Sequence, residues 1–398
     1  MRAMSSLLTI EEALARVLEH VQPLETELVG LDAAAGRVLA EDVHATVDLP
    51  PFPSSAMDGF AVRAADTPGS LPVVARIAAG RPAERPLAAG EAMEISTGGV
   101  VPEGADAVVP IEVVVVEGNT LTVPDAAEPG AHVRSVGGDV RRGDRLLAAG
   151  TTLRPALVGA LAAAGVATVT CSRRPRVTVL STGTELRPPG EPLGAGEIYE
   201  ANAVMLAAAA RTAGADASAL DPVEDDEEAH RVAVDQGLAG DVLVTSGGVS
   251  VGPHDLVRRI EEELGVEEVF WRVAVKPGKP VSFGVRGRTL VFGLPGNPVS
   301  ALVGFELFVR PALLALQRAE PGPFYRSGRL AAPVRRVEER DQLLRARSRL
   351  DGGDLLLEPL RGQDSHMIAR AAAADALVLV RRGEGELAAG ASVSYLPL

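Results

Sequence analysis

The sequence contains little lysine, little cysteine and few aromatic residues. Only Lys276 and Lys279 are lysines among 39 basic residues, so the other 37 are arginines. The single cysteine, Cys171, excludes an internal disulfide and a metal cluster held by several thiolates. The 6 histidines are scattered without the spacing of metal ligands. These absences indicate a protein of a reducing compartment.

The sequence also lacks a long apolar run and an excess of positive charge. A bilayer span needs about 18 or more apolar residues, and the closest run, residues 155–169, is shorter and contains glycines. The net charge of −14 disfavours binding to nucleic acids or anionic membranes. Thr9 and Glu12 form the capping-box pattern of an amphipathic helix rather than part of a signal peptide. We therefore expect a cytoplasmic protein with no membrane or nucleic-acid partner.

The two lysines lie three residues apart in the turn-rich segment Val275–Pro280, VKPGKP. All other positively charged positions, histidines apart, are arginines. We therefore interpret Lys276 and Lys279 as positions that need a compact ammonium group rather than a planar guanidinium. Pro277 and Pro280 stiffen the loop because each fixes its own φ. Such a rigid pair of charges can stabilise a transferred oxyanion. The alternatives are compositional drift and ordinary solvated lysines.

A chain of 398 residues predicts two to four domains. Between residues 174 and 318, short β-branched runs alternate with helical stretches, as in a parallel α/β sheet. We predict strands at 175–181, 241–245, 269–275, 281–284 and 289–292, and helices at 202–213, 225–237, 254–264 and 298–316. In such sheets, ligands bind at the loops after the carboxyl ends of the strands.

The remaining sequence is rich in short strands and turns. Residues 44–143 predict an inserted all-β domain, and residues 323–398 a small barrel or sandwich. Residues 24–43 with 144–174 form the expected connecting domain, which leaves 4–23 with 175–322 for the α/β domain. The predicted fold class is thus α/β plus β, in several domains.

Three loops of unusual composition follow predicted strands, and we expect them to converge on one rim of the sheet. They are Ser181–Glu185, Ser246–Gly252 and Leu294–Ser300. Glycines and hydroxyls before a helix, as in SGGVSVG, suit a phosphate or pyrophosphate. The loop lacks the spacing of a P-loop or a dinucleotide fingerprint, so the motif indicates only anion binding. A tight strand-to-helix turn is the alternative.

Several carboxylates lie beside glycines. They include Asp58 in SAMDG, Asp139 in GGD, and Asp225 and Asp226 before a helix. Each alone is most simply a turn or cap residue, as is Thr97 in TGG. Together they suggest a Mg²⁺ ion bound through one or two carboxylates and substrate phosphates.

Six motifs occur in the order found in one known family. They are PPFPSSAMDGFAV from Pro50, STGGVVPEGADAVVPIE from Ser96, STGTEL from Ser181, SGGVSVGPHD from Ser246, VKPGKP from Val275 and GLPGNPVS from Gly293. The chain resembles the molybdopterin molybdenumtransferases, the MoeA and gephyrin E-domain family, over essentially its whole length. The resemblance implies an enzyme that inserts molybdate into adenylylated molybdopterin and releases AMP.

The resemblance also implies roles for individual residues. Molybdate would be held by Lys276, Lys279, Ser300, Arg340 and Ser365. The pterin nucleotide would contact Ser246, Gly247, Gly248, Ser250, Asp255, Pro295, Gly296, Asn297 and Pro298, with Thr97 and Asp139 in the inserted domain. The expected catalytic residues are Asp58, Glu185 and Asp225 together with Lys276 and Lys279, and Asp58 is the candidate ligand for Mg²⁺ or another divalent ion.

Family members are elongated homodimers, so the resemblance implies that the inserted domain of one subunit faces the central molybdopterin-binding domain of the other. The site would then be composite, and Asp58 could act in cis or in trans. Further expected partners are a molybdopterin adenylyltransferase and molybdoenzyme acceptors or chaperones. The sequence departs from the family pattern at Pro53, Ser54, Phe60, Thr184 and Pro253-His254, none of which has an assigned chemical role.

Two other functions remain possible at this point. The α/β domain also resembles the adenylyltransferase of the preceding step, but stand-alone adenylyltransferases lack the flanking β domains. A non-catalytic pterin-binding scaffold would not need the complete set of SAMDG, KPGK and PGNPVS. We therefore place the molybdenum insertase ahead of both.

Overall fold

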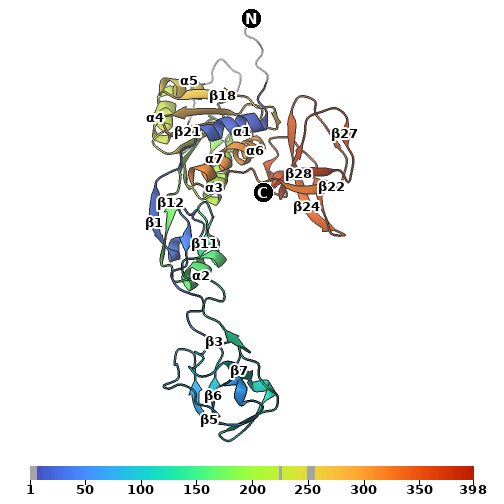
Figure 1. The fold of residues 1–398 in the computed structure, drawn as a ribbon. Coiled ribbons are helices and arrows are strands. Elements are labelled where there is room, and N and C mark those ends of the chain that lie inside the picture. The colour runs from blue at the N-terminus through green and yellow to red at the C-terminus, as the bar shows by residue number, and fades with distance from the viewer. Residues whose placement is uncertain (1–6, 224–225, 249–255) are drawn as a thin grey trace. The chain divides into compact units, whose positions relative to one another are not determined.

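The computed structural model describes residues 7–223, 226–248 and 256–398. The chain divides into two compact units. The first unit consists of Met1–Glu27, Gly36–Ala40 and Cys171–Leu398, and the second of Leu28–Ala35 and Glu41–Thr170. Figure 1 shows an α/β sheet and a C-terminal β-sheet in the first unit, and mainly strands in the second. The finer division into four domains stays a prediction.

A six-stranded sheet forms the centre of the first unit, in the order β16-β13-β17-β21-β20-β18. These strands are β16 (Asp216–Ala219), β13 (Arg176–Ser181), β17 (Val242–Ser246), β21 (Thr289–Leu294), β20 (Ser282–Arg286) and β18 (Glu267–Trp271). The first four pair in parallel, as predicted, whereas β20 is antiparallel to both of its neighbours. Only Gly287 and Arg288 join β20 to β21, and a parallel pair needs a much longer crossover.

The strand predicted over 269–275 is wrong as a single element. β18 ends at Trp271, and β19 (Val275–Lys276) joins a different sheet. Between them Arg272 has a φ of 80°, in the left-handed region that interrupts an extended strand. Since β18 is antiparallel to β20, and β20 to β21, β18 runs in the same direction as β21. The lysine segment therefore leaves the sheet at the same edge as the loops after β13, β17 and β21.

Helices cover both faces of this sheet (Figure 1). On one face α3 (Asn202–Thr212) contacts α6 (Pro298–Gly304), and α1 (Ile10–Glu19) packs on α7 (Arg310–Leu316). On the other face lie α4 (Glu227–Gly237) and α5 (Leu256–Glu263). The two cores use alternate residues of the strands, because side chains of a strand alternate in direction: Val179 belongs to the first core and Leu180 to the second.

The predicted capping box starts α1. Glu12 N donates to Thr9 Oγ1 at 3.1 Å, and Thr9 N donates to Glu12 Oε2 at 2.8 Å. Two backbone donors that a helix leaves without partners are thereby satisfied. The apolar face of α1 buries Ile10, Ala13 and Val17 in the core, so the prediction of an amphipathic helix is confirmed.

The predicted helix 298–316 forms, but a π-helical turn, η4 (Phe305–Val309), separates α6 from α7. Within the described chain it is the one helix long and apolar enough to cross a membrane, and 78% of its apolar window is buried. This corrects the view that 155–169 is the closest apolar run. The two charged side chains of the segment pair with each other, since Arg310 Nε donates to Glu306 Oε2 at 2.6 Å. A mostly buried helix of this kind is a normal feature of a globular core.

The C-terminal strands close into a barrel, as the sequence predicted. In order around the ring these strands are β24 (Asp341–Asp351), β25 (Asp354–Pro359), β22 (Arg326–Leu330), β28 (Ser392–Pro397) and β26 (Ala376–Val380), and β26 pairs again with β24. Closure leaves no free sheet edge in this ring. β19 pairs with β24 from outside it. Smaller elements of the first unit are β14 (Leu186–Arg187), β15 (Ile198–Tyr199), β23 (Val334–Arg335), α8 (Ile368–Ala371) and β27 (Glu386–Leu387).

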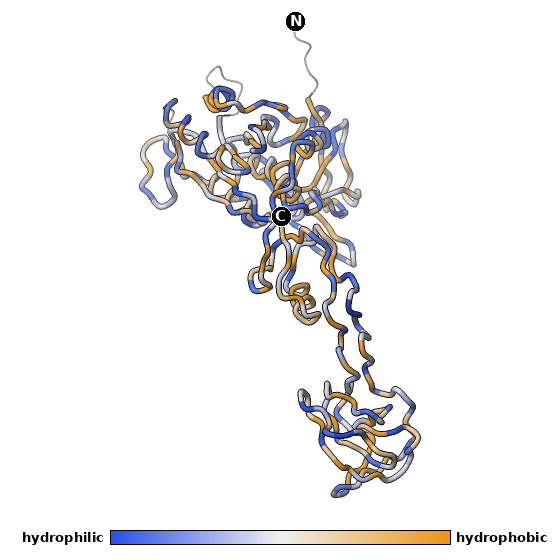
Figure 2. Tube along the Cα trace, turned by 60° about the vertical axis from the view of Figure 1, so that its left-hand side comes forward, coloured by the Kyte–Doolittle hydropathy of each residue, from blue (hydrophilic) through white to orange (hydrophobic). Residues whose placement is uncertain are grey.

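The second unit contains a six-stranded sheet in the order β7-β4-β6-β5-β9-β8. These strands are β4 (Gly59–Val62), β5 (Gly69–Ile77), β6 (Ala92–Ile95), β7 (Ala107–Pro110), β8 (Val115–Glu117) and β9 (Thr120–Val123). In β9, Leu121 and Val123 are buried while Thr120 and Thr122 are exposed, and Figure 2 shows such changes of hydropathy along the chain. The prediction of an all-β insertion, which rested on short β-type runs separated by proline and glycine, agrees with this sheet.

Short elements complete the chain at either end of the insertion. Two-stranded sheets pair β1 (Thr26–Gly30) with β12 (Thr168–Ser172), β2 (Val43–His44) with β11 (Arg145–Leu147), and β3 (Ser54–Ser55) with β10 (Val133–Arg134). The helical pieces are η1 (Leu31–Ala33), η2 (Ala64–Asp66), η3 (Ile111–Val113) and α2 (Pro155–Ala163). Pro155 begins α2 at a position where the missing N–H costs no helical hydrogen bond.

Candidate functional site

The lysine loop is closed by backbone hydrogen bonds. Arg272 N donates to Val281 O at 2.9 Å, and Val273 N donates to Lys279 O at 3.0 Å. Gly278, at the tip, has a φ of 104° and lies against the backbone of Ser300, so that a side chain at this position would be strained and close to the Ser300 carbonyl. The tip of the loop, with one lysine on either side of Gly278, therefore lies beside the start of α6.

The barrel brings Arg340 to the same loop. Strand β19 pairs in parallel with β24, with Val275 opposite Asp341 and Lys276 opposite Gln342. In addition, Asp341 N donates to Ala274 O at 3.0 Å. Arg340 directly precedes this junction and is half-buried. Arg340, which the family resemblance assigns to molybdate, is thus next in sequence to Asp341, the residue that pairs with Val275 beside Lys276.

Ser365 reaches the site through a loop of the barrel. Val299 N donates to Ser365 O at 3.1 Å, which places Ser365 next to the residue before Ser300. Ser300 is 4% exposed and lies in the first turn of α6. The five residues predicted to hold molybdate therefore come from four segments, which backbone hydrogen bonds link in pairs: the lysine loop with the start of β24, and the start of α6 with the Ser365 loop.

Arg345, which the sequence analysis did not single out, holds the Ser365 loop in place. It is 1% exposed and is the largest fully buried side chain of the described chain. Its guanidinium donates to Gly362 O at 2.8 Å, Met367 O at 3.0 Å and Asp364 O at 3.2 Å. Burial lowers the pKa of Arg345, yet the three carbonyls and Gln363 Oε1 satisfy a charge that would otherwise be very costly to bury. Arg345 carries no distinctive sequence signal, because arginines also occur at positions 347 and 349 of the same strand.

The glycine loops after β17 and β21 meet, as predicted from parallel strands. Gly247 N donates to Leu294 O at 3.1 Å, and Ser246 Oγ donates to Pro295 O at 3.3 Å. Gly247 has a φ of 93°, and a Cβ at this position would lie 2.8 Å from Thr182 O, so only glycine fits. Thr182 follows β13, so loops from three strands come together at this rim. Glycine-containing loops of this kind are a common setting for anion binding through backbone amides.

Two residues at the start of α3 tie these three loops together, and the sequence analysis missed both. Asn202 Nδ2 donates to Ser246 Oγ at 2.9 Å and to Gly296 O at 2.7 Å. Glu200, 5% exposed, accepts from Ser181 Oγ at 2.9 Å and from Ala203 N at 2.7 Å. The available sequence signal was the pair of polar residues Glu200 and Asn202 at the start of an apolar helix, a pattern typical of a simple helix cap.

Other predicted residues of the first unit lie near this rim or outside the described residues. Glu185 is exposed in the loop after β13, where its carbonyl accepts from Ile198 N at 2.8 Å. Asn297 and Pro298 begin α6 in the loop after β21. Gly248 lies against Val257 of α5. Asp225, Ser250 and Asp255 lie outside the described residues.

The second unit contains a separate pair of predicted residues. Asp58 Oδ1 accepts from Thr97 N at 2.7 Å and from Thr97 Oγ1 at 3.1 Å, and both residues are exposed. Asp139 is also exposed, and its N–H donates to Leu49 O at 2.9 Å, next to the proline-rich start of the SAMDG motif. Asp58 Oδ2 accepts no hydrogen bond from the described residues, so the carboxylate keeps one oxygen available.

Comparison with known proteins finds members of one family that match this chain along its whole length. Three family models match: the MoeA N-terminal region (domain I and II) at residues 8–165, a probable molybdopterin binding domain at 178–315, and the MoeA C-terminal region (domain IV) at 327–398. The molybdopterin molybdenumtransferase of Haemophilus influenzae is 34% identical over 399 residues, which cover 98% of each chain. Molybdopterin molybdenumtransferase 2 of Mycobacterium tuberculosis is 37% identical and covers 98% of this chain and 99% of its own.

Solved structures agree with the computed one. A crystal structure of the molybdopterin biosynthesis MoeA protein from Pyrococcus horikoshii is 33% identical, with a TM-score of 0.81 and coverage of 98% of this chain and 99% of that chain. Another crystal structure, of a molybdopterin biosynthesis MoeA protein from Pyrococcus horikoshii OT3, gives a TM-score of 0.85 at 28% identity and covers 99% of this chain and 100% of that chain. The chain belongs to the MoeA family of molybdopterin molybdenumtransferases.

Proposed function

We propose that this protein is a molybdenum insertase, a transferase that inserts molybdate into adenylylated molybdopterin and releases AMP. One observation carries the proposal: backbone hydrogen bonds link the lysine segment to the start of β24, next to Arg340, and link Val299, next to Ser300, to Ser365. Molybdate is a tetrahedral dianion, so cations and hydroxyl donors around one point suit it. The alternatives, an adenylyltransferase or a scaffold, have no observation of their own in their favour.

The residues of the rim have distinct tasks in this reaction. The amides and hydroxyls of the two glycine loops bind the pyrophosphate of the nucleotide substrate, because they are fixed donors directed at one edge of the sheet. Lys276 and Lys279 stabilise negative charge on the molybdate oxygens and on the departing AMP phosphate. Ser300 and Ser365 donate hydroxyl hydrogen bonds that orient the oxyanion next to them.

A divalent ion, Mg²⁺ in the simplest case, would bind at Asp58 together with substrate phosphates. No group of three or more histidine, cysteine or carboxylate residues suited to a metal occurs within the described residues, so protein side chains alone do not build a closed site there. Asp58 Oδ2 is available as one ligand, and Mg²⁺ commonly binds through one or two carboxylates, phosphate oxygens and water. Thr97 would fix the rotamer of Asp58 by its two hydrogen bonds.

We further propose a cytoplasmic homodimer in which Asp58 of one subunit serves the rim of the other. The support is the resemblance to the family together with the location of Asp58 and the lysines in different units of the chain. An adenylyltransferase would supply the nucleotide substrate, and molybdoenzymes or their chaperones would receive the product.

The decisive experiment measures AMP release from purified protein given adenylylated molybdopterin, Mg²⁺ and molybdate. We expect molybdate-dependent release that falls by about a hundredfold in Asp58→Ala, if the carboxylate orients metal or substrate. Asp125→Ala removes another exposed carboxylate of the same unit and should keep normal turnover. AMP release that does not depend on molybdate, or bound nucleotide without turnover, would contradict an insertase.

A further inference from the structure

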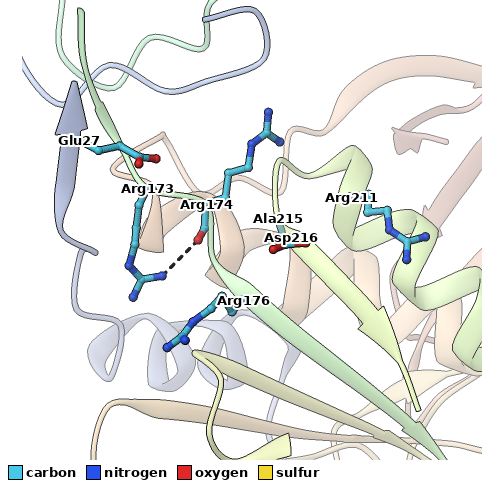
Figure 3. Close-up of a pocket in the computed structure, with 7 residues that line it drawn as sticks. All are labelled: Glu27, Arg173, Arg174, Arg176, Arg211, Ala215 and Asp216. Atoms are coloured by element: carbon cyan, nitrogen blue, oxygen red, sulfur yellow. Dashed lines mark hydrogen bonds between the residues drawn. The ribbon is translucent and has the colours of Figure 1, made fainter. Parts of the chain in front are cut away.

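A second pocket, of about 770 Å³, lies away from the lysine loop and contains none of the residues predicted for the reaction. It opens at the other edge of the α/β sheet, where β13 begins at Arg176 and β16 begins at Asp216. Figure 3 shows the residues that line it: Glu27, Arg173, Arg174, Arg176, Arg211, Ala215 and Asp216. All of them belong to the first unit.

One of the four arginines is a fixed part of the wall. Arg173 donates to both oxygens of Asp241, at 2.7 and 2.8 Å, and to Glu25 Oε2 at 3.0 Å. The hydrogen bonds that Arg173 donates to Asp241 raise the pKa of Arg173. A bidentate pair of this kind is geometrically rigid, so Arg173 anchors the segment from which Arg174 and Arg176 extend.

The other three arginines retain donors that no described residue uses. Arg174 makes one long bond, 3.4 Å, to Gly214 O. The side chain of Arg176 is 65% exposed and forms an ion pair with Asp241, in which Nε lies 3.8 Å from Oδ2, beyond hydrogen-bond distance. Arg211 donates through Nε and Nη2 to Ala217 O, which leaves Nη1. In Figure 3, Ala215 and Asp216 lie between Arg174 and Arg211.

The acidic residues of the pocket do not balance these charges. Glu27 forms an ion pair with Arg37, outside the lining. Asp216 is exposed and forms no ion pair with any described residue. Three arginines with free donors thus line the same pocket as one carboxylate without an ion pair, in a chain whose net charge is −14. An excess of positive charge at one concave place in an acidic protein favours a multivalent anion.

We propose that this pocket is a second anion site that binds an oligophosphate group. Guanidinium groups match phosphate oxygens in geometry and can donate two hydrogen bonds to each phosphate. The volume lies within the range of about 300–1,000 Å³ that small-molecule sites have. The phosphates can belong to a nucleoside triphosphate or to free polyphosphate, since both present the same group. The site is independent of the insertase reaction, because it lies at the opposite edge of the sheet.

Isothermal titration calorimetry with inorganic tripolyphosphate tests this inference on the full chain. We expect binding at low ionic strength that weakens by at least about tenfold in the double variant Arg174→Gln/Arg176→Gln, because two sets of charge-assisted hydrogen bonds are removed. The matched control is Arg326→Gln/Arg347→Gln, which removes two exposed arginines of the barrel and should change affinity less than about twofold. Thermal unfolding of both variants checks that they are folded.

A parallel titration with ATP identifies the source of the phosphates. Tighter binding of ATP than of tripolyphosphate, lost in the same double variant, indicates a nucleotide site, whereas binding of tripolyphosphate alone indicates free polyphosphate. Equal loss in the control variant, or no effect of Arg174→Gln/Arg176→Gln, overturns the proposal. AMP release from adenylylated molybdopterin should be unchanged in the double variant, so failure of the anion site and failure of the insertase assignment are separable.

Discussion

The two units hold their predicted functional residues in different ways. In the first unit, the lysine loop, the two glycine loops and the Ser365 loop are each fixed by backbone hydrogen bonds to another segment, and the buried side chains of Arg345 and Glu200 support them. In the second unit, the exposed carboxylate of Asp58 is fixed by Thr97 alone. An oxyanion site benefits from donors that need no reorganisation, whereas a residue that meets a metal or a second subunit must stay accessible.

The largest effect is expected from the lysine loop, where charge and shape can be separated. Lys279→Arg keeps the charge but replaces a compact ammonium with a bulky planar group. We expect turnover to fall by about 10²–10³, the range seen when one fixed donor to a transition-state oxyanion is lost. The measurement is molybdate-dependent AMP release, with Arg288→Lys in the exposed β20–β21 turn as the reverse exchange of little effect. Near-normal turnover of Lys279→Arg would show that the ammonium geometry does not matter.

Removing the support of the Ser365 loop tests whether rigidity is needed there. Arg345→Met leaves the carbonyls of Gly362, Asp364 and Met367 without their donor, so we expect a loss of about 3 kcal/mol in the free energy of unfolding. Urea unfolding measures it, and the KM for molybdate should rise in the fraction that stays folded. Arg347→Met, an exposed arginine two residues later, should stay within about 0.5 kcal/mol. Equal effects of the two substitutions would rule out the proposed support.

Weakening the contact between the two glycine loops is expected to lower turnover by a smaller factor. Asn202→Ala removes both hydrogen bonds, to Ser246 Oγ and Gly296 O. We expect turnover to fall by about tenfold, because the two loops are then no longer held in a fixed position relative to each other. Ser246→Ala combined with Asn202→Ala should cost less than the sum of the two, as residues in one network do. Asn119→Ala in the exposed β8–β9 turn is the matched control. Strict additivity would mean that Asn202 does not act through Ser246.

The sequence predicted the parts of the site that carry local signals. Glycines and prolines mark loops wherever they occur, and strand ends of a parallel sheet meet at one edge, so the meeting of the loops after Ser181, Ser246 and Leu294 followed from pattern alone. The two lysines stood out because the rest of the chain uses arginine. These features are properties of a few consecutive residues or of composition, which a sequence shows directly.

The residues that support the loops could not be found in this way. Arg345 looks like any charged residue of a half-exposed strand, and Asn202 and Glu200 look like ordinary residues at a helix start. Their roles depend on partners that are 17 to 94 positions away in sequence, such as Gly362 for Arg345 and Gly296 for Asn202. The antiparallel direction of β20 and the left-handed Arg272 were missed for a related reason, because β-branched runs indicate strands without their direction.

The smallest expected effect concerns the exposed pair of the second unit. Thr97→Val removes the hydroxyl hydrogen bond to Asp58 Oδ1 but leaves the shorter one from the backbone N–H, so turnover should fall by only about threefold, as for one net hydrogen bond of roughly 0.7 kcal/mol. Thr120→Val, on the exposed face of β9, should have no effect on AMP release. A fall as large as that of Asp58→Ala would mean that the Thr97 hydroxyl itself contacts substrate, and the second unit would then be as pre-organised as the first.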